Sequence, residues 1–418
     1  MWEPLSWVKE YLQVSGGNHF VATFCKTGKR LKGTEVEELG GSRGLFHHLH
    51  FPSGTEAGYD SHVSRKLHCQ KNMSKQENGL SDMHSWPEQQ QLPSVLFTEN
   101  VRKLHTSIEN DWDSLRRSAC QTAAGRAMWK HVIHDPLAEL LAGETCLRSL
   151  HEKIKKDQIT NAKETSGVIL AVRTLWFDSK IEAALSSFGG GAAQVVLLGA
   201  GMDTRAYRLS CLKESYVFEV DFPEVLQTKA MLLQAAAAGS TTEDQHPEVT
   251  AKSLSRVAAD IREIDWLEKL QKSGFEPKMN TVWVLEGIIY YLPHSNAMEV
   301  LKIIADNCNV TQTVLLADFM NKQSTTLCNS LFHFYSDWPD QLLPSLGFSE
   351  VKLSQIGDAD ADFGLFHDPL NLFNRLRSLP RSLQTHPDDG TPCCRLYLLQ
   401  ASGSPNQTIS SGQDADTA

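Results

Sequence analysis

No apolar run in this 418-residue chain approaches the length of a membrane span, so we expect no membrane partner. The sequence also has no compact basic patch, and its formal net charge of −10 argues against binding to a nucleic-acid backbone. Its nine cysteines include no CxxC pair, which favours a reducing compartment. The first ten residues match neither a signal peptide nor an Arg-rich transit peptide. Together these absences predict a cytoplasmic protein.

The first hundred residues lack a sustained helical or strand pattern and are rich in polar residues and glycine. We therefore expect a poorly structured extension over 1–100, one domain over 101–402 and a disordered tail over 403–418. A group of histidines and one cysteine in the extension raises a zinc hypothesis, but its spacing fits no standard site, so we predict no metal. That group is His47, His48, His50, His68 and Cys69.

A short apolar run that ends in a glycine turn is the most informative feature of the sequence. Val195–Leu198 suits a buried parallel strand, and Gly199 and Gly201 follow it. Asp203 and Thr204 could then cap a helix. Such a turn brings bare backbone close to a ligand, as in the nucleotide-binding sites of open α/β sheets.

Carboxylates end the next three predicted strands. Asp221, with Glu219 before it, closes a strand over 216–223, and Asp260 closes one over 256–262. Glu286 lies near the end of an apolar strand that begins at Thr281. Ligands bind at this edge of a doubly wound sheet, where an acid can accept hydrogen bonds from ribose hydroxyls.

The acids favour S-adenosylmethionine over NAD as the cofactor. The dinucleotide fingerprint needs a third glycine, where this chain has Thr204, and Asp203 would repel a pyrophosphate. A cofactor with a ribose, an adenine, an ammonium and a sulfonium, but no phosphate, suits an acid-lined pocket. An NAD oxidoreductase is therefore a distant alternative.

Six segments in a fixed order resemble the leucine carboxyl methyltransferase family, and within it the O-methyltransferase-like branch of bacteria and plants. They are 133–138, 172–178, 199–209, 219–223, 258–262 with Trp266, and 285–293. The resemblance implies a class I methyltransferase fold: an α/β, Rossmann-like, doubly wound seven-stranded sheet with a helical lid.

The resemblance also implies seven contacts to S-adenosylmethionine. Arg173 would meet the methionine carboxylate, the glycines would admit the amino acid portion, and Glu286 would lie near it. Asp221 would bind the ribose, with Glu219 as a weaker substitute, while Asp260 and Ile261 would flank the adenine. The full set is Arg173, Gly199, Gly201, Asp221, Asp260, Ile261 and Glu286.

For several neighbouring residues we expect a structural role instead of a contact with the cofactor. Asp203 is better explained as a helix cap, and Arg205 and Arg208 as partners in structural ion pairs. Glu219 would then face solvent or pair with a base. Tyr290 and Tyr291 fit a core and a pocket lining equally well.

The implied activity is methyl transfer to a carboxylate or hydroxyl of a small molecule. No residue is identifiable as a general base, which favours an acceptor that is already ionised. The motifs differ from those of the family's protein-methylating branch, so a protein C-terminal carboxylate is the less favoured acceptor. An inactive methyltransferase fold that serves as an interaction module is the third reading.

The remaining strands are expected over 313–319, 348–353 and 394–400, the last of them antiparallel between its neighbours. The helices before Arg173 and the aromatic stretches 331–338 and 363–367 would form a lid or simply pack in the core. His333 and His367 are the candidates for accepting a proton from the acceptor.

Overall fold

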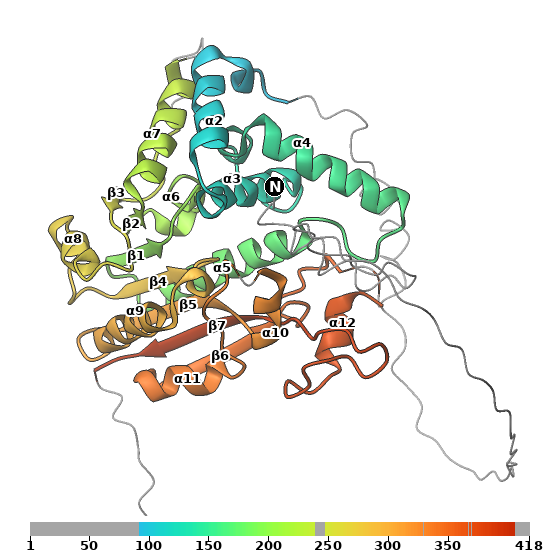
Figure 1. The fold of residues 1–418 in the computed structure, drawn as a ribbon. Coiled ribbons are helices and arrows are strands. Elements are labelled where there is room, and N and C mark those ends of the chain that lie inside the picture. The colour runs from blue at the N-terminus through green and yellow to red at the C-terminus, as the bar shows by residue number, and fades with distance from the viewer. Residues whose placement is uncertain (1–91, 239–246, 329, 367, 369, 406–418) are drawn as a thin grey trace, which may run out of the picture. The chain divides into compact units, whose positions relative to one another are not determined.

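A computed structural model describes residues 92–238, 247–328, 330–366, 368 and 370–405. Its centre is one seven-stranded sheet in the order β3-β2-β1-β4-β5-β7-β6 (Figure 1). The strands are β1 (Ala193–Leu198), β2 (Ser215–Asp221), β3 (Ser253–Ala258), β4 (Thr281–Leu285), β5 (Thr313–Met320), β6 (Glu350–Gln355) and β7 (Leu396–Gly403). The predicted class of fold is confirmed, including the last strand between β5 and β6.

The parallel part of the sheet has buried, apolar central strands because both of its faces are covered. Every residue of β1, β4 and β5 is buried. β1 pairs in parallel with both β2 and β4, so the chain leaves β1 towards one side of the sheet and later returns to the other. The carboxyl ends of β1 and β4 therefore flank a switch point, where open α/β sheets bind ligands.

Helices lie on both faces of the sheet, with α5 and α7 on one face and α8, α9 and α11 on the other (Figure 1). Before β1 come α2 (Glu99–Asp111), α3 (Ser114–Met128), α4 (Ala138–Ile159) and α5 (Val168–Ser187). After β1 come α6 (Arg205–Arg208), α7 (Pro223–Ala238), α8 (Trp266–Lys272), α9 (His294–Asn307), α10 (Lys322–Thr325), α11 (Pro339–Leu346) and α12 (Leu372–Arg377). None of the helices in the described ranges is both long enough and apolar enough for a membrane crossing.

Local signals explain where the site helices begin. Asp113 accepts a hydrogen bond from the Arg116 amide at 2.8 Å and so caps the start of α3. Gly167, at φ 86°, precedes the long apolar helix α5. This glycine adopts a left-handed conformation that other residues rarely take.

The predicted strand ends differ from the observed ones where polar residues interrupt the pattern. β3 ends at Ala258, so Asp260 lies two residues beyond the strand. β7 starts at Leu396 and continues to Gly403, one residue past the predicted domain end. At the other end α2 begins at Glu99, before the predicted boundary at residue 101.

Candidate functional site

Two adjoining cavities lie at the carboxyl edge of the parallel strands. The large cavity encloses about 860 Å³, part of it open to solvent, and the small cavity about 410 Å³. Residues from the first turn, the end of β2, α3 and the segment after β4 line both cavities. These shared residues are Leu115, Gly199, Asp221, Phe222 and Ile288.

The glycine turn after β1 forms the floor of the large cavity. Gly199 has φ 68°, and a Cβ there would lie 2.7 Å from the Ile288 side chain. Gly201 has φ 48°, and its Cβ would lie 3.0 Å from Ala119 Cβ of α3. Both positions therefore need glycine, for conformation and for space, and the turn presents bare backbone to the cavity.

Asp221 lies in the wall that the two cavities share. Its carboxylate accepts hydrogen bonds from the amides of Gly201, at 2.6 Å, and Phe222, at 2.7 Å. Burial raises the pKa of Asp221 to about 6, although these two amides oppose the rise. The ionised carboxylate is thus poorly solvated and would gain from further donors, such as hydroxyl groups.

Arg173 and Glu286 meet at one end of the large cavity. Arg173 Nε donates to Glu286 Oε1 at 3.1 Å, and Arg173 Nη1 donates to Asp318 Oδ2 at 3.2 Å. The Arg173 and Asp318 side chains are 5% and 0% exposed. This end of the cavity therefore offers a buried guanidinium beside carboxylates.

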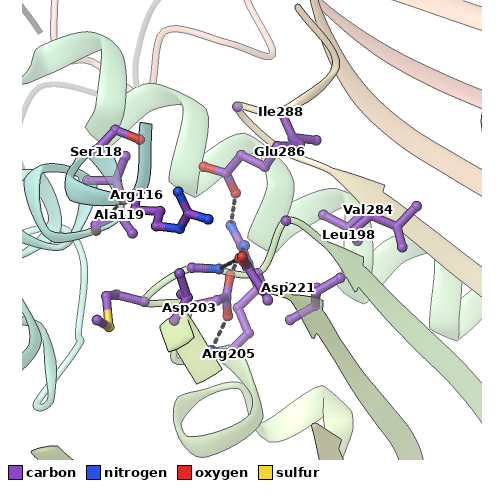
Figure 2. A pocket seen from close by; sticks show the side chains of 18 of the residues that line it. Arg116, Ser118, Ala119, Leu198, Asp203, Arg205, Asp221, Val284, Glu286 and Ile288 are labelled. Atoms are coloured by element: carbon purple, nitrogen blue, oxygen red, sulfur yellow. Dashed lines mark hydrogen bonds and ion pairs between the residues drawn. The ribbon is translucent and has the colours of Figure 1, made fainter. Parts of the chain in front are cut away.

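A second guanidinium, that of Arg205, links Glu286 to two further carboxylates. Arg205 donates to Glu286 Oε2 at 2.6 Å and to Asp203 (Figure 2). It also donates to Asp178 Oδ1 at 2.7 Å. Arg208 also pairs with Asp178, at 2.6 Å. Arg205 and Arg208 thus make ion pairs, as their structural reading expects, although Arg205 also lines the cavity.

Asp203 combines a capping contact with a place in the cavity lining. It accepts from the amide of Arg205, the first residue of α6, at 2.7 Å, while Thr204 holds the N-cap position of that helix without a side-chain capping bond. Burial raises its pKa, but Arg205 and the other nearby cations lower it more, so the pKa falls to about 2. Asp203 therefore keeps a negative charge in the lining.

The small cavity contains Asp260 and Ile261. Arg262 already binds Asp260, with Nη2 at 2.5 Å from Oδ2. The Phe222 ring lies under the guanidiniums of Arg262, at 5.6 Å, and Arg116, at 4.4 Å. An aromatic face and an aliphatic side chain thus border this cavity, next to a partly engaged carboxylate.

The structure brings all seven predicted contact residues to the lining of the two cavities; their roles stay predictions. Five line the large cavity and four the small one, with Gly199 and Asp221 common to both: Arg173, Gly199, Gly201, Asp221 and Glu286, then Gly199, Asp221, Asp260 and Ile261.

Other candidates lie elsewhere. Glu219 is fully buried and pairs with Lys229 at 2.8 Å and Arg256 at 3.1 Å, so it does not face solvent and lines neither cavity. Tyr290 is buried beside Arg173, whereas Tyr291 lines the small cavity. His333 is exposed and outside both linings.

His367 and the histidine group of the proposed zinc site lie outside the described residues. Within the described ranges, no cluster of three or more histidine, cysteine, aspartate or glutamate side chains could hold a metal ion.

Sequence reasoning missed two parts of the site. α3 closes one side of the large cavity with Arg116, Ser118 and Ala119, opposite the apolar residues Leu198 and Val284 (Figure 2). Its small residues showed no pattern that distinguishes a cavity wall from a packing face. Asp318 was also missed, although it is an acid near the end of the predicted fifth strand and carried the same signal as Asp221.

Comparisons with known proteins point to one family. The model for "Leucine carboxyl methyltransferase" matches residues 119–305. A provisionally named S-adenosyl-L-methionine-dependent methyltransferase of Mycobacterium marinum is 39% identical over 136 residues, which cover 32% of this chain and 39% of that protein. A protein of the same description from Mycobacteroides abscessus is 33% identical over 204 residues, covering 44% and 62%. The chain thus spans about two to three fifths of these relatives' length.

A further match is to a solved structure. The crystal structure of a provisionally named methyltransferase from Thermobifida fusca has 12% sequence identity and a TM-score of 0.41. The match covers 68% of this chain and 94% of that one.

Proposed function

Since residues 119–305 match the model of the leucine carboxyl methyltransferase family, we propose that this chain binds S-adenosylmethionine and transfers its methyl group to an acceptor. The observation that carries the proposal is the meeting of seven predicted contact residues at two adjoining cavities. Segments that are more than a hundred residues apart in the chain supply them. A chance arrangement of unrelated acids would not line one continuous edge.

The chemistry of the lining fits this cofactor. Arg173 can pair with a carboxylate, and Glu286 can pair with an ammonium, so one end of the large cavity suits an amino acid. In the shared wall, Asp221 can accept from two ribose hydroxyls. The small cavity can hold the adenine against Ile261, with Asp260 sharing its oxygens between Arg262 and the exocyclic amine.

The same lining argues against a dinucleotide. Asp203, Asp221 and Glu286 all border the large cavity, next to the glycine turn where a pyrophosphate would lie. Arg205 pairs with Asp203 and Glu286, so Asp221 is the carboxylate of this lining that makes no ion pair with any described residue. It would repel a phosphate placed on the turn, whereas it can accept from ribose hydroxyls.

When bound, S-adenosylmethionine supplies a methyl group on a sulfonium leaving group. The protein must hold the acceptor within roughly 3–3.5 Å of that methyl and exclude water. α3 covers the large cavity and can serve this purpose, because it contacts the glycine turn through Ala119. Arg126 of α3 also donates to the Met202 carbonyl at 2.5 Å.

We propose that the acceptor is a carboxylate or hydroxyl of a small molecule. The described linings of the two cavities contain no histidine or lysine that could remove a proton. A carboxylate is already ionised and needs no base. A protein C-terminal carboxylate is the second candidate, since it shares this property and gives the family its name.

The first test is calorimetric titration of the purified chain with S-adenosylmethionine, with NAD as the matched control. We expect micromolar binding of the first and none of the second. Binding of neither would favour an inactive fold, and binding of NAD would refute the proposal. Labelled methyl transfer to small-molecule or protein fractions then separates the two acceptor classes.

The affinity for S-adenosylmethionine should depend on pH through Asp221. Its pKa of about 6 means that the carboxylate is ionised above this pH and protonated below it. Ribose hydroxyls donate to the ionised form, so the part of the affinity that depends on Asp221 should be full well above pH 6 and fall about tenfold for each unit well below it. Calorimetry across this range measures the slope.

Burial also raises the pKa of Asp318 to about 6, although Arg173 opposes the rise. Protonation of Asp318 should therefore add to the pH dependence of the affinity. Asp221→Asn removes only the first of the two groups. It should therefore make the pH dependence shallower by about one proton without abolishing it. An unchanged slope in this variant would contradict the role of Asp221.

A further inference from the structure

Asp318 is a fully buried acid that none of the proposed cofactor contacts uses. It lies on β5, where all eight residues are buried, and its side chain is 0% exposed. A buried carboxylate is costly unless its oxygens are hydrogen-bonded or paired with a cation. Both Asp318 oxygens have such partners, and both partners belong to the site.

The first partner is the backbone just after Glu286. Asp318 Oδ1 accepts from the Gly287 amide at 2.7 Å. Gly287 has φ 71°, so this segment turns sharply away from β4 directly after Glu286. Asp318 therefore fixes the turn from which the Glu286 side chain extends.

The second partner is the Arg173 guanidinium. Asp318 Oδ2 accepts from Nη1 at 3.2 Å, and the Tyr290 hydroxyl lies 3.3 Å from the same nitrogen. Glu286 occupies Nε. Among the described residues Nη2 makes no hydrogen bond, so this nitrogen keeps its donors for a ligand in the cavity that Arg173 lines.

We infer that Asp318 is a positioning residue, which holds Arg173 and the Gly287 turn so that Nη2 is presented to the carboxylate of the bound cofactor. This inference rests on the proposed function. It assigns Asp318 no contact with the cofactor, because its two oxygens are already occupied. Without its charge, Arg173 would be drawn towards Glu286 alone and would present a different edge.

The role predicts a selective effect on ligands. S-adenosylhomocysteine carries the carboxylate that Arg173 would bind, whereas 5′-methylthioadenosine has the same nucleoside and thioether without the amino acid group. If Arg173 loses its position, only the binding of S-adenosylhomocysteine should weaken. A merely structural role for Asp318 would weaken both ligands alike.

The test compares calorimetric affinities of both ligands for the full chain and for Asp318→Asn. Asparagine keeps an oxygen for the Gly287 amide and removes the charge that faces Arg173. We expect roughly tenfold weaker binding of S-adenosylhomocysteine, the size of a charge-assisted hydrogen bond, and unchanged binding of 5′-methylthioadenosine. Tyr290→Phe is the matched control, since it removes a neutral partner from the same nitrogen and should have a smaller effect.

Each outcome is decisive. Equal weakening of both ligands, or no weakening of either, would overturn the positioning role while leaving the cofactor assignment intact. Failure of the unmodified chain to bind either ligand would instead overturn the proposed function, and this role with it. If Asp318→Asn does not fold, Gly287→Ala tests the same guanidinium, because the added Cβ would lie 3.2 Å from Nη2. That variant should show the same selective loss.

Discussion

Replacing Asp221 with alanine should reduce the affinity for S-adenosylmethionine by roughly a hundredfold or more. The carboxylate can accept two ribose hydroxyls, and each hydrogen bond to a charged group contributes about 1.5–3 kcal/mol. Glu219, the weaker substitute, cannot replace it, because Glu219 pairs with Lys229 and Arg256 and lines neither cavity. Calorimetric titration of the variant measures the loss.

The same substitution should leave the fold intact, which separates a binding role from a structural one. Burial raises the pKa of Asp221, so at neutral pH its ionised form is unfavourable in the empty site. Asp221→Asn removes that charge but keeps an oxygen for only one of the Gly201 and Phe222 amides, which donate to different oxygens of Asp221. The gain and the loss oppose each other, so its melting temperature at neutral pH should stay close to that of the unmodified chain. Normal binding by Asp221→Ala would refute the assignment.

Replacing Arg205 with alanine should produce the largest loss of stability among the site residues. The Arg205 side chain is 3% exposed and joins Asp178, Asp203 and Glu286. Removing one member of a buried ionic network leaves uncompensated charge and costs about 3–5 kcal/mol. Urea unfolding followed by circular dichroism measures the change in the free energy of unfolding.

An exposed ion pair supplies the control. Lys272 and Glu268 of α8 lie 2.5 Å apart, with side chains 71% and 63% exposed. Lys272→Ala should cost less than about 1 kcal/mol, because water screens such pairs. The penalty of Arg205→Ala should also shrink at acidic pH, where the stranded carboxylates take up protons. A loss as small as that of the control would mean that the network contributes little.

The sheet and the cofactor side of the site could be predicted because each rests on a local signal. Val195–Leu198 is a continuous apolar run before a glycine turn, and parallel strands carry their terminal acids to one edge. Asp221 and Glu286 therefore needed only the strand assignments to be placed together. Asp260 reached the same edge even though β3 ends at Ala258, two residues before it, since the backbone beyond the strand continues along this edge.

The residues that sequence reasoning missed depend on contacts between distant segments. Asp318 and Arg173 are 145 positions apart, and nothing near either residue shows that they pair. α3 forms a cavity wall because Ala119 packs on Gly201, and an alanine looks the same in any helix. The place of Glu219 depends on which side of β2 its side chain faces. It faces Lys229 on the following helix, α7, and not the cavities.

The insertion of β7 between β5 and β6 has a consequence for how this protein is made. β7 pairs with all eight residues of β5, yet it is the last strand of the chain. During synthesis, β1 to β5 can therefore assemble before β7 has been made, so one edge of β5 is still unpaired. An unpaired edge of a largely apolar strand is a template for aggregation. A nonsense mutation shortly before Leu396 would keep all the cavity residues but remove β7, which leaves this edge of β5 unpaired. We therefore expect such truncated chains to aggregate, and not only to lose activity.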